Sequence, residues 1–252
     1  MVLALIVLLP SAICRRSMEN MEVTMGIIIT WHGHATFSLE INGVNVVVDP
    51  FFAGNNPVTD TPVSEVKADF VLQTHGHGDH ISDTVGLAKA TGAQVITNFE
   101  IANWINAQGH ENTWAMNTGG SFQFPFGRVK MTPALHSSGL PDGSYGGDPG
   151  GYLIFADGGT LYFSGDTALF SDMSLIGAAG IDLAVVPTGD NFTMGPQDAL
   201  ASLGYLNPKV VIPCHYNTWP PIAQDMHAWA ERVNRETAVK AVVLGVGESF
   251  EL

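Results

Sequence analysis

Runs of apolar residues at strand and helix spacing predict regular structure along almost the whole chain after Gly26. Strand patterns cover 26–41 and 44–48, and Asn42-Gly43 between them is typical of a tight hairpin turn. The pattern then alternates, with a strand predicted over 69–73, a helix over 81–90, a strand over 94–97 and a helix over 99–108. This half of the chain therefore combines hairpin strands with a strand–helix rhythm.

The second half also begins with strands and continues with alternating helices and strands. Strands are predicted over 122–135, with breaks at Pro125 and Gly127, and over 152–156 and 160–163. Further along, buried strands at 181–186, 210–212 and 241–244 alternate with helices at 196–206 and 222–235. Because strands open each half and helices follow, we expect an α/β fold with two sheets face to face and helices outside.

A long segment rich in Gly, Ser, Asp and Pro, residues 137–151, separates two of these strands. A loop of about 15 residues is uncommon inside a compact domain unless it contributes to a functional site. We therefore expect this loop to lie at such a site.

The N-terminal segment does not fit the predicted fold. Its apolar run, residues 2–9, is far shorter than the roughly 20 residues that a membrane-spanning helix needs. A secretory signal would carry basic residues before the run, whereas Arg15 and Arg16 follow it. We expect residues 1–24 to be a leader or a mis-assigned start, and residues 25–252 to form a single domain. A cytoplasmic protein is favoured, and a secreted or periplasmic one remains the alternative if the apolar run is a signal.

Composition and charge narrow the partners that the protein can have. The chain is 46% hydrophobic and 13% charged, which is typical of a globular protein with a large core. It carries 10 Lys+Arg against 24 Asp+Glu, a net charge of −14. Because polyanion binding depends on basic residues, this balance argues against nucleic acid and against stable membrane association. A small-molecule substrate is the better expectation, and a homo-oligomer remains open.

Four potential metal ligands lie within six residues at the end of a predicted buried strand. They are His75, His77, Asp79 and His80, and glycines separate the first three. Imidazole nitrogens and carboxylate oxygens bind Zn, Mn or Fe. We expect the glycines to let the backbone turn sharply, so that several side chains can point at one centre. A cluster this dense predicts a metal site.

Further potential ligands follow apolar runs later in the chain. His136, Asp166 and His215 each come shortly after a predicted strand. Because four ligands from one loop cannot all reach one ion in good geometry, His75 and His77 are expected on one metal, and Asp79 and His80 on another. The carboxyl ends of strands in α/β sheets are where ligand sites form, so the three later residues are candidates to complete both sites.

These motifs resemble the metallo-β-lactamase superfamily of metal-dependent hydrolases, through the form H-x-H-x-D-H at 75–80 together with His136, Asp166 and His215. More narrowly, the chain resembles a family of small metal-dependent hydrolases related to L-ascorbate-6-phosphate lactonase. The matching segments are Gly33-His34-Ala35-Thr36-Phe37, Asp49-Pro50-Phe51, 131–138, Ser164-Gly165-Asp166-Thr167, Thr193-Met194-Gly195-Pro196 and 213–218. The resemblance covers nearly everything from Gly26 to the C-terminus.

The resemblance implies a four-layer αββα sandwich with two divalent metal ions, Zn or Mn, at one edge. Carried over position by position, the first metal would be bound by His75, His77 and His136, the second by Asp79, His80 and His215, and Asp166 would bridge them. A water shared by such ions has a pKa near 7 instead of ~15.7, and the resulting bridging hydroxide would cleave a small ester, lactone or phosphate-containing metabolite. Asp79 and Asp166 are then catalytic as well as metal-binding, and His34 is expected to contact substrate or a ligand.

Two other functions use the same ligands. A phosphodiesterase or nuclease needs a surface that grips phosphate, and Arg128, Lys130 and Lys209 are few and scattered. A redox module would hold a di-iron centre, for which the resemblance implies Glu where this chain has His77. A hydrolytic centre is the preferred interpretation.

Overall fold

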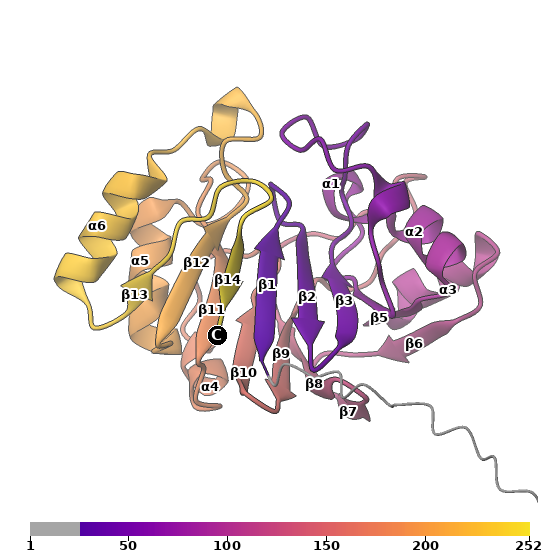
Figure 1. Cartoon of the computed structure of the whole chain (residues 1–252), viewed down its shortest axis with the longest axis horizontal. Coiled ribbons are helices and arrows are strands. Elements are labelled where there is room, and N and C mark those ends of the chain that lie inside the picture. Colours follow the sequence, from indigo (N-terminus) through magenta and orange to yellow (C-terminus); the bar gives the residue numbers. More distant parts are fainter. Residues whose placement is uncertain (1–25) are drawn as a thin grey trace, which may run out of the picture.

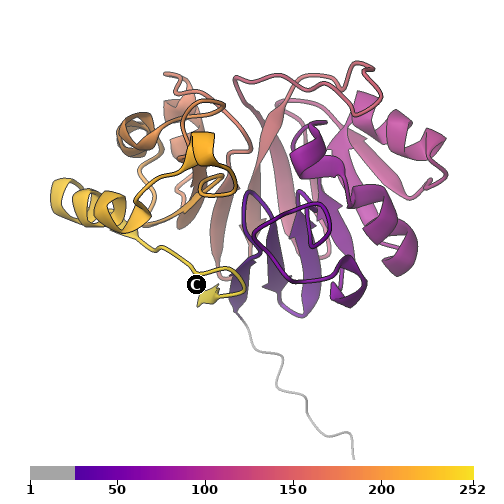
Figure 2. The same cartoon turned by 90° about the horizontal axis from the view of Figure 1, so that it is seen from above.

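The computed structural model describes residues 26–252 and contains two seven-stranded β-sheets packed face to face, with helices on both outer faces (Figures 1 and 2). The predicted four-layer αββα sandwich is therefore confirmed. The prediction made for residues 1–24 lies outside the described residues. No helix within 26–252 is long and apolar enough to span a membrane.

Each sheet is part antiparallel and part parallel. The first runs in the order β14 (Ser249–Glu251), β1 (Ile27–Trp31), β2 (Phe37–Ile41), β3 (Val44–Val48), β4 (Phe70–Leu72), β5 (Gln94–Asn98) and β6 (Thr113–Met116). The second runs in the order β13 (Lys240–Ala241), β12 (Val210–Cys214), β11 (Leu183–Pro187), β10 (Gly159–Phe163), β9 (Gly150–Ala156), β8 (Gly127–Pro133) and β7 (Ser121–Phe124). Pairing is parallel from β3 to β6 and from β10 to β13, so these carboxyl ends point the same way within each sheet.

Three helices cover each outer face. On the first sheet lie α1 (Gly78–Ile81), α2 (Thr84–Thr91) and α3 (Phe99–Ala107), and on the second α4 (Met173–Gly177), α5 (Pro196–Leu206) and α6 (Met226–Glu236). Single turns of 3₁₀-helix, η1 (Val63–Glu65) and η2 (Pro220–Ile222), lie in the connections. In Figure 1, α5 and α6 stand at the left of the view and α2 and α3 at the right, with the strands between them.

Alternation along the strands divides the core into two parts. Val47, Val71 and Val95 are fully buried on the face that packs against α1, α2 and α3. Their neighbours Leu72 and Ile96 point the other way, into the larger core between the sheets. Successive strand side chains point to opposite faces, so short runs of Val, Leu and Ile serve both layers at once.

The structure corrects the predicted elements at several places. The single helix expected over 81–90 is two helices, because α1 begins inside the histidine motif and α2 starts after a break at Ser82-Asp83. The strand expected over 241–244 ends at Ala241, since the chain leaves the second sheet there and crosses to pair β14 with β1. Strand β6 and helix α4 lie where no element was predicted.

One buried hydroxyl joins the two sheets next to the end of β4. Tyr152 on β9 donates from its hydroxyl to the backbone oxygen of Gln73, at 2.8 Å, and to that of Ile96, at 3.2 Å. Replacing Tyr152 with phenylalanine should lower the free energy of unfolding by about 1 kcal/mol and Tm by about 2–4 °C, measured by thermal denaturation.

Tyr162 is the matched control for this variant. It is also fully buried in the second sheet, near the hydroxyl of Thr132, but its own hydroxyl makes no hydrogen bond of normal geometry with the described residues. Tyr162→Phe should leave Tm unchanged or raise it. Equal losses in both variants would show that the link between the sheets contributes nothing.

Candidate metal centre

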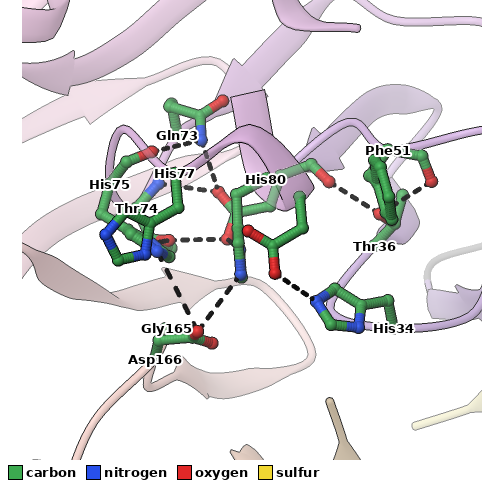
Figure 3. A network of polar contacts seen from close by, with 12 residues as sticks. His34, Thr36, Phe51, Gln73, Thr74, His75, His77, His80, Gly165 and Asp166 are labelled. Carbon is green, nitrogen blue, oxygen red and sulfur yellow. Dashed lines mark hydrogen bonds and ion pairs between the residues drawn. The ribbon is translucent and has the colours of Figure 1, made fainter. Parts of the chain in front are cut away.

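The sequence-predicted ligands meet at one edge of the sandwich, where strands from both sheets end. Residues 75–80 follow β4 in the first sheet, whereas His136, Asp166 and His215 follow β8, β10 and β12 in the second. Because these strand ends meet at one edge, seven side chains from four segments face one centre. Figure 3 shows His75, His77, His80 and Asp166 of this set.

Asp166 lies at the middle of this cluster. Its Oδ2 is 3.0 Å from Nε2 of His215, 3.3 Å from that of His80, 3.5 Å from that of His136 and 4.0 Å from that of His75. His75 and His136 belong to the ligand set implied for the first metal. His80 and His215 belong to the set implied for the second. Figure 3 shows Asp166 facing the histidine motif from the opposite sheet.

The first set of potential ligands is compact. One nitrogen each of His75, His77 and His136 lie within 4.8 Å of one another. Nδ1 of His77 is 3.2 Å from Nε2 of His136, while its Nε2 lies 3.1 Å from the hydroxyl of Ser137. Facing nitrogens of this kind can share one ion.

The second set contains one more residue than the sequence predicted. Ligand atoms of Asp79, His80, His215 and His34 lie within 4.8 Å of one another. Oδ2 of Asp79 is 3.8 Å from Nε2 of His215. The same oxygen is 3.1 Å from Nε2 of His34, so His34 contacts a carboxylate of the centre.

Several atoms of the centre are buried without a hydrogen-bond partner. They are Nε2 of His75, His80 and His215 and Oδ1 of Asp166, together with Nδ1 on the other edge of the His215 ring. Buried polar atoms are normally paired, and leaving one unpaired costs about 1–3 kcal/mol. Four such atoms directed at one place fit metal coordination, because a cation satisfies lone pairs that no protein donor reaches. The residues therefore fit a metal centre.

Asp49 has a role that the sequence motifs did not reveal. Its Oδ2 accepts a hydrogen bond from the Thr74 hydroxyl, at 2.6 Å, and lies 2.8 Å from Nδ1 of His80. Thr74 has one hydroxyl hydrogen, so it must accept from Nδ1 of His75, 2.9 Å away. Both histidines then carry hydrogen on Nδ1 and present the lone pair of Nε2 to the centre. The sequence did contain a sign of this role, because Asp49 directly follows a buried strand, as the later ligand residues do.

His34 is placed to orient Asp79 more than to touch substrate. The ring is fully buried, and Nδ1 lies 2.8 Å from the hydroxyl of Thr218. Burial, reinforced by repulsion from His215, lowers the pKa of His34 to about 4, so the ring is neutral at pH 7. Since the Asp79 carboxylate can only accept, the hydrogen of His34 sits on Nε2 and fixes that carboxylate.

The electrostatics of the centre favour positive charge between carboxylates. Burial lowers the pKa of His80, but the carboxylates of Asp166 and Asp49 outweigh burial and raise it well above its usual value. Burial also raises the pKa of Asp166, yet His215 and His80 hold it well below its usual range. The raised pKa of His80 and the lowered pKa of Asp166 both indicate that the buried carboxylates are ionised and favour a cation between them.

The backbone at the centre is unusual at three residues, none of them the glycines of the motif. His34, Asp49 and His215 have φ values of 54°, 46° and 57°, a region that non-glycine residues seldom adopt. Gly76 and Gly78 are not among the residues with positive φ, so the chain passes from β4 to α1 without using the left-handed region at these glycines. Space is tight at Gly76, because a Cβ there would lie 3.0 Å from the side chain of Leu140, which would have to shift.

A pocket of about 500 Å³ opens onto the cluster. It is lined by His77, Asp79, His136, Ser137, Asp166, Phe192, His215, Trp219 and Pro221. Ser137 begins the loop over 137–151, so the expectation that this loop reaches a site is supported. Phe192 and Trp219 were not among the sequence-predicted site residues, because a single aromatic residue in a loop carries no local signal for a pocket.

The fold and the histidine–carboxylate cluster define a protein class. The family model for the β-lactamase superfamily domain matches residues 44–216. A UPF0173 metal-dependent hydrolase of a Geobacillus species is 51% identical over 233 residues, covering 89% of this chain and 99% of that protein. Another, from Thermus thermophilus, is 48% identical and covers 89% of this chain and 98% of its own.

A solved structure agrees with these relatives. Igni18, described as a novel metallo hydrolase from the archaeon Ignicoccus hospitalis, superposes with a TM-score of 0.82 at 33% identity, covering 90% of this chain and 98% of that one. The chain thus belongs to the UPF0173 family of metal-dependent hydrolases within the β-lactamase superfamily.

Proposed function

We propose that the chain is a dinuclear hydrolase that binds Zn or Mn and cleaves a small ester, lactone or phosphate-containing metabolite. In this proposal His75, His77 and His136 hold one ion, Asp79, His80 and His215 hold the other, and Asp166 contacts both. The proposal rests mainly on Asp166, whose Oδ2 lies within 4.0 Å of histidine nitrogens from both sets.

When bound, such an ion pair would lower the pKa of a bound water to near 7 and polarise the oxygen at the scissile bond. The side chain of Asp79 is 28% exposed and lines the pocket, so this proposed ligand also faces a bound substrate. Nε2–H of His34 holds one oxygen of that carboxylate and leaves the other free. Asp49 keeps His75 and His80 in the tautomer that ligation requires.

The position of the basic side chains supports a small-molecule substrate. Arg128 and Lys130 lie on β8, and Lys209 directly precedes β12. Among the described residues, none of the three lines the pocket. The phosphodiesterase or nuclease alternative would need these cations at the metal edge, because phosphate contacts supply most of the affinity for nucleic acid.

Elemental analysis combined with a substrate panel tests the proposal. The purified protein should contain two equivalents of Zn or Mn per chain. It should hydrolyse p-nitrophenyl butyrate or γ-butyrolactone in a way that a chelator abolishes and added metal restores. One equivalent or less in the active protein would contradict the dinuclear centre. Preferred cleavage of bis-p-nitrophenyl phosphate and single-stranded DNA would favour the alternative.

Metal removal should also lower thermal stability, independently of activity. Binding to the folded state alone stabilises it by about 2.7 kcal/mol when free metal is 100 times Kd, which corresponds to roughly 5–10 °C in Tm for a chain of this size. Calorimetry with and without EDTA measures the shift. EDTA presaturated with Zn is the control and should have no effect. An unchanged Tm on chelation would mean that the cluster holds no metal.

A further inference from the structure

One wall of the metal pocket is apolar. Phe192, Trp219 and Pro221 line it beside the ligand residues, and Ser137 is the remaining uncharged polar residue there. Phe192 is 55% exposed and lines the pocket, so its ring is open to a molecule bound there. Apolar surface of this kind at a metal pocket can bind the non-reacting part of a substrate.

The position of Phe192 is set by a tightly turned loop tied to the metal centre. The two residues before it, Asp190 and Asn191, have φ values of 67° and 58°, which Asp and Asn tolerate better than most residues. The backbone N–H of Asp190 donates to Met194 O, at 3.1 Å, and that of Met194 donates to Thr167 O, at 3.0 Å. Thr167 directly follows Asp166, so Phe192 is anchored to the segment that carries the central carboxylate.

Trp219 is anchored in the same way from the other side. Its ring lies edge-on to His34, with centroids 5.0 Å apart, and 6.3 Å from Phe51. The preceding Thr218 contacts Nδ1 of His34, and two prolines in η2 follow. Proline restricts the backbone, so the ring is held in place before any ligand arrives.

The described part of the chain offers no basic side chain to this pocket. Its eight Lys and Arg residues are Lys67, Lys89, Arg128, Lys130, Lys209, Arg232, Arg235 and Lys240, and none is among the lining residues. Lys67 and Lys209 precede β4 and β12, and Lys240 begins β13. The carboxyl ends of these strands point towards the site, so the three lysines lie at the opposite ends. An anionic group away from the scissile bond would therefore lose hydration without gaining an ion pair to a basic side chain, which is costly.

We propose that the natural substrate is an uncharged ester or lactone whose apolar group packs against Phe192, Trp219 and Pro221. This inference rests on the proposed hydrolytic function and selects among its substrate classes. Water adds across the acyl–oxygen bond. A new carbon–oxygen bond forms at the acyl carbon, the bond to the leaving oxygen breaks, and a proton from water passes to that oxygen, giving an acid and an alcohol.

Two comparisons with the metal-loaded enzyme and a constant p-nitrophenyl leaving group test the proposal. Removing one methylene group from water strengthens binding by about threefold to fourfold. The value of kcat/KM should therefore rise by about tenfold or more from the acetyl to the hexanoyl ester. The butyryl ester should exceed mono-p-nitrophenyl succinate, which carries a carboxylate at the remote end, by about tenfold or more.

Phe192→Ala identifies the wall that carries this preference. The variant should reduce the hexanoyl-to-acetyl ratio to about twofold or less, because the acyl chain loses its contact surface. Phe99→Ala is the matched control, since Phe99 is 56% exposed on α3 and does not line the pocket. It should keep the ratio of the unaltered enzyme.

The outcomes separate the two proposals. Chelator-sensitive hydrolysis with no dependence on chain length, or with the succinyl ester preferred, would overturn the apolar substrate class and leave the dinuclear hydrolase standing. A chain-length dependence that persists in Phe192→Ala would also overturn it. Failure of every ester, together with less than two equivalents of metal, would overturn the proposed function itself.

Discussion

Replacing Asp166 with asparagine should lower bound metal below two equivalents and reduce kcat/KM by more than about 100-fold, beyond the range typical of residues that only support ligands. Asparagine keeps the shape of the side chain and removes its charge. Oδ2 of Asp166 is the one carboxylate oxygen of the described site that lies within 4.0 Å of four histidine nitrogens. Elemental analysis and ester hydrolysis measure the two effects.

Asp157→Asn is the control for this variant. Asp157 is exposed in the turn between β9 and β10, at the end of β10 opposite to Asp166. It should retain metal and activity. Circular dichroism should show both variants folded, because the two-sheet core does not depend on either carboxylate. Full metal content and activity in Asp166→Asn would show that the assignment of a shared ligand is wrong.

Asp49→Asn should weaken metal binding by about 10–100-fold, although Asp49 is not itself expected to bind metal. Oδ2 of Asp49 faces the Thr74 hydroxyl and Nδ1 of His80, while Oδ1 accepts from the backbone N–H of Thr74 and from Nε2 of Gln73. In either orientation the amide nitrogen of asparagine, which cannot accept, replaces one of these two acceptors. Where it faces His80, the ring would favour the tautomer with hydrogen on Nε2, the atom that faces the centre. A competition titration against a chromophoric chelator measures the affinity directly.

Asp69→Asn provides the comparison for Asp49. Asp69 precedes β4 and accepts hydrogen bonds from the backbone and side-chain nitrogens of Asn45, at 2.8 and 3.0 Å, at the other end of the same strands. The Asp69→Asn variant should bind metal as tightly as the unaltered chain. If both variants bind metal as tightly as the unaltered chain, the tautomer argument fails. Equal losses in both would indicate a general effect on β3 and β4.

Much of the candidate site could be predicted from local sequence because strand ends carry it. His136, Asp166 and His215 each follow an apolar run, and the carboxyl ends of those strands meet at one edge. The same reasoning could have included Asp49, which follows β3 in the same manner. It was passed over because its contact with His80 joins residues 31 positions apart, and no local pattern reports such a contact.

The elements were predicted correctly where local periodicity decides the packing. They were missed where a strand pairs with a segment far away in the sequence. The alternation that places Val71 and Leu72 on opposite faces is a property of the strand itself. Strand β14 is three residues long, and it exists because the chain returns to pair with β1 more than 200 residues earlier. At the break between α1 and α2, the carboxylate of Asp83 accepts a hydrogen bond from the backbone nitrogen of Phe52, 31 residues away in the chain.

The sequence by itself determined the layered α/β architecture, the metal-binding chemistry and the residues able to provide it, since apolar periodicity and ligand type are local properties. Tertiary structure alone decided which atoms face one another. It placed Asp166 between two histidine sets. It brought Asp49 against His80 and, through Thr74, linked it to His75, and it brought Phe192 and Trp219 to one pocket. The reason is geometric, because distances between side chains on different strands depend on sheet register and packing.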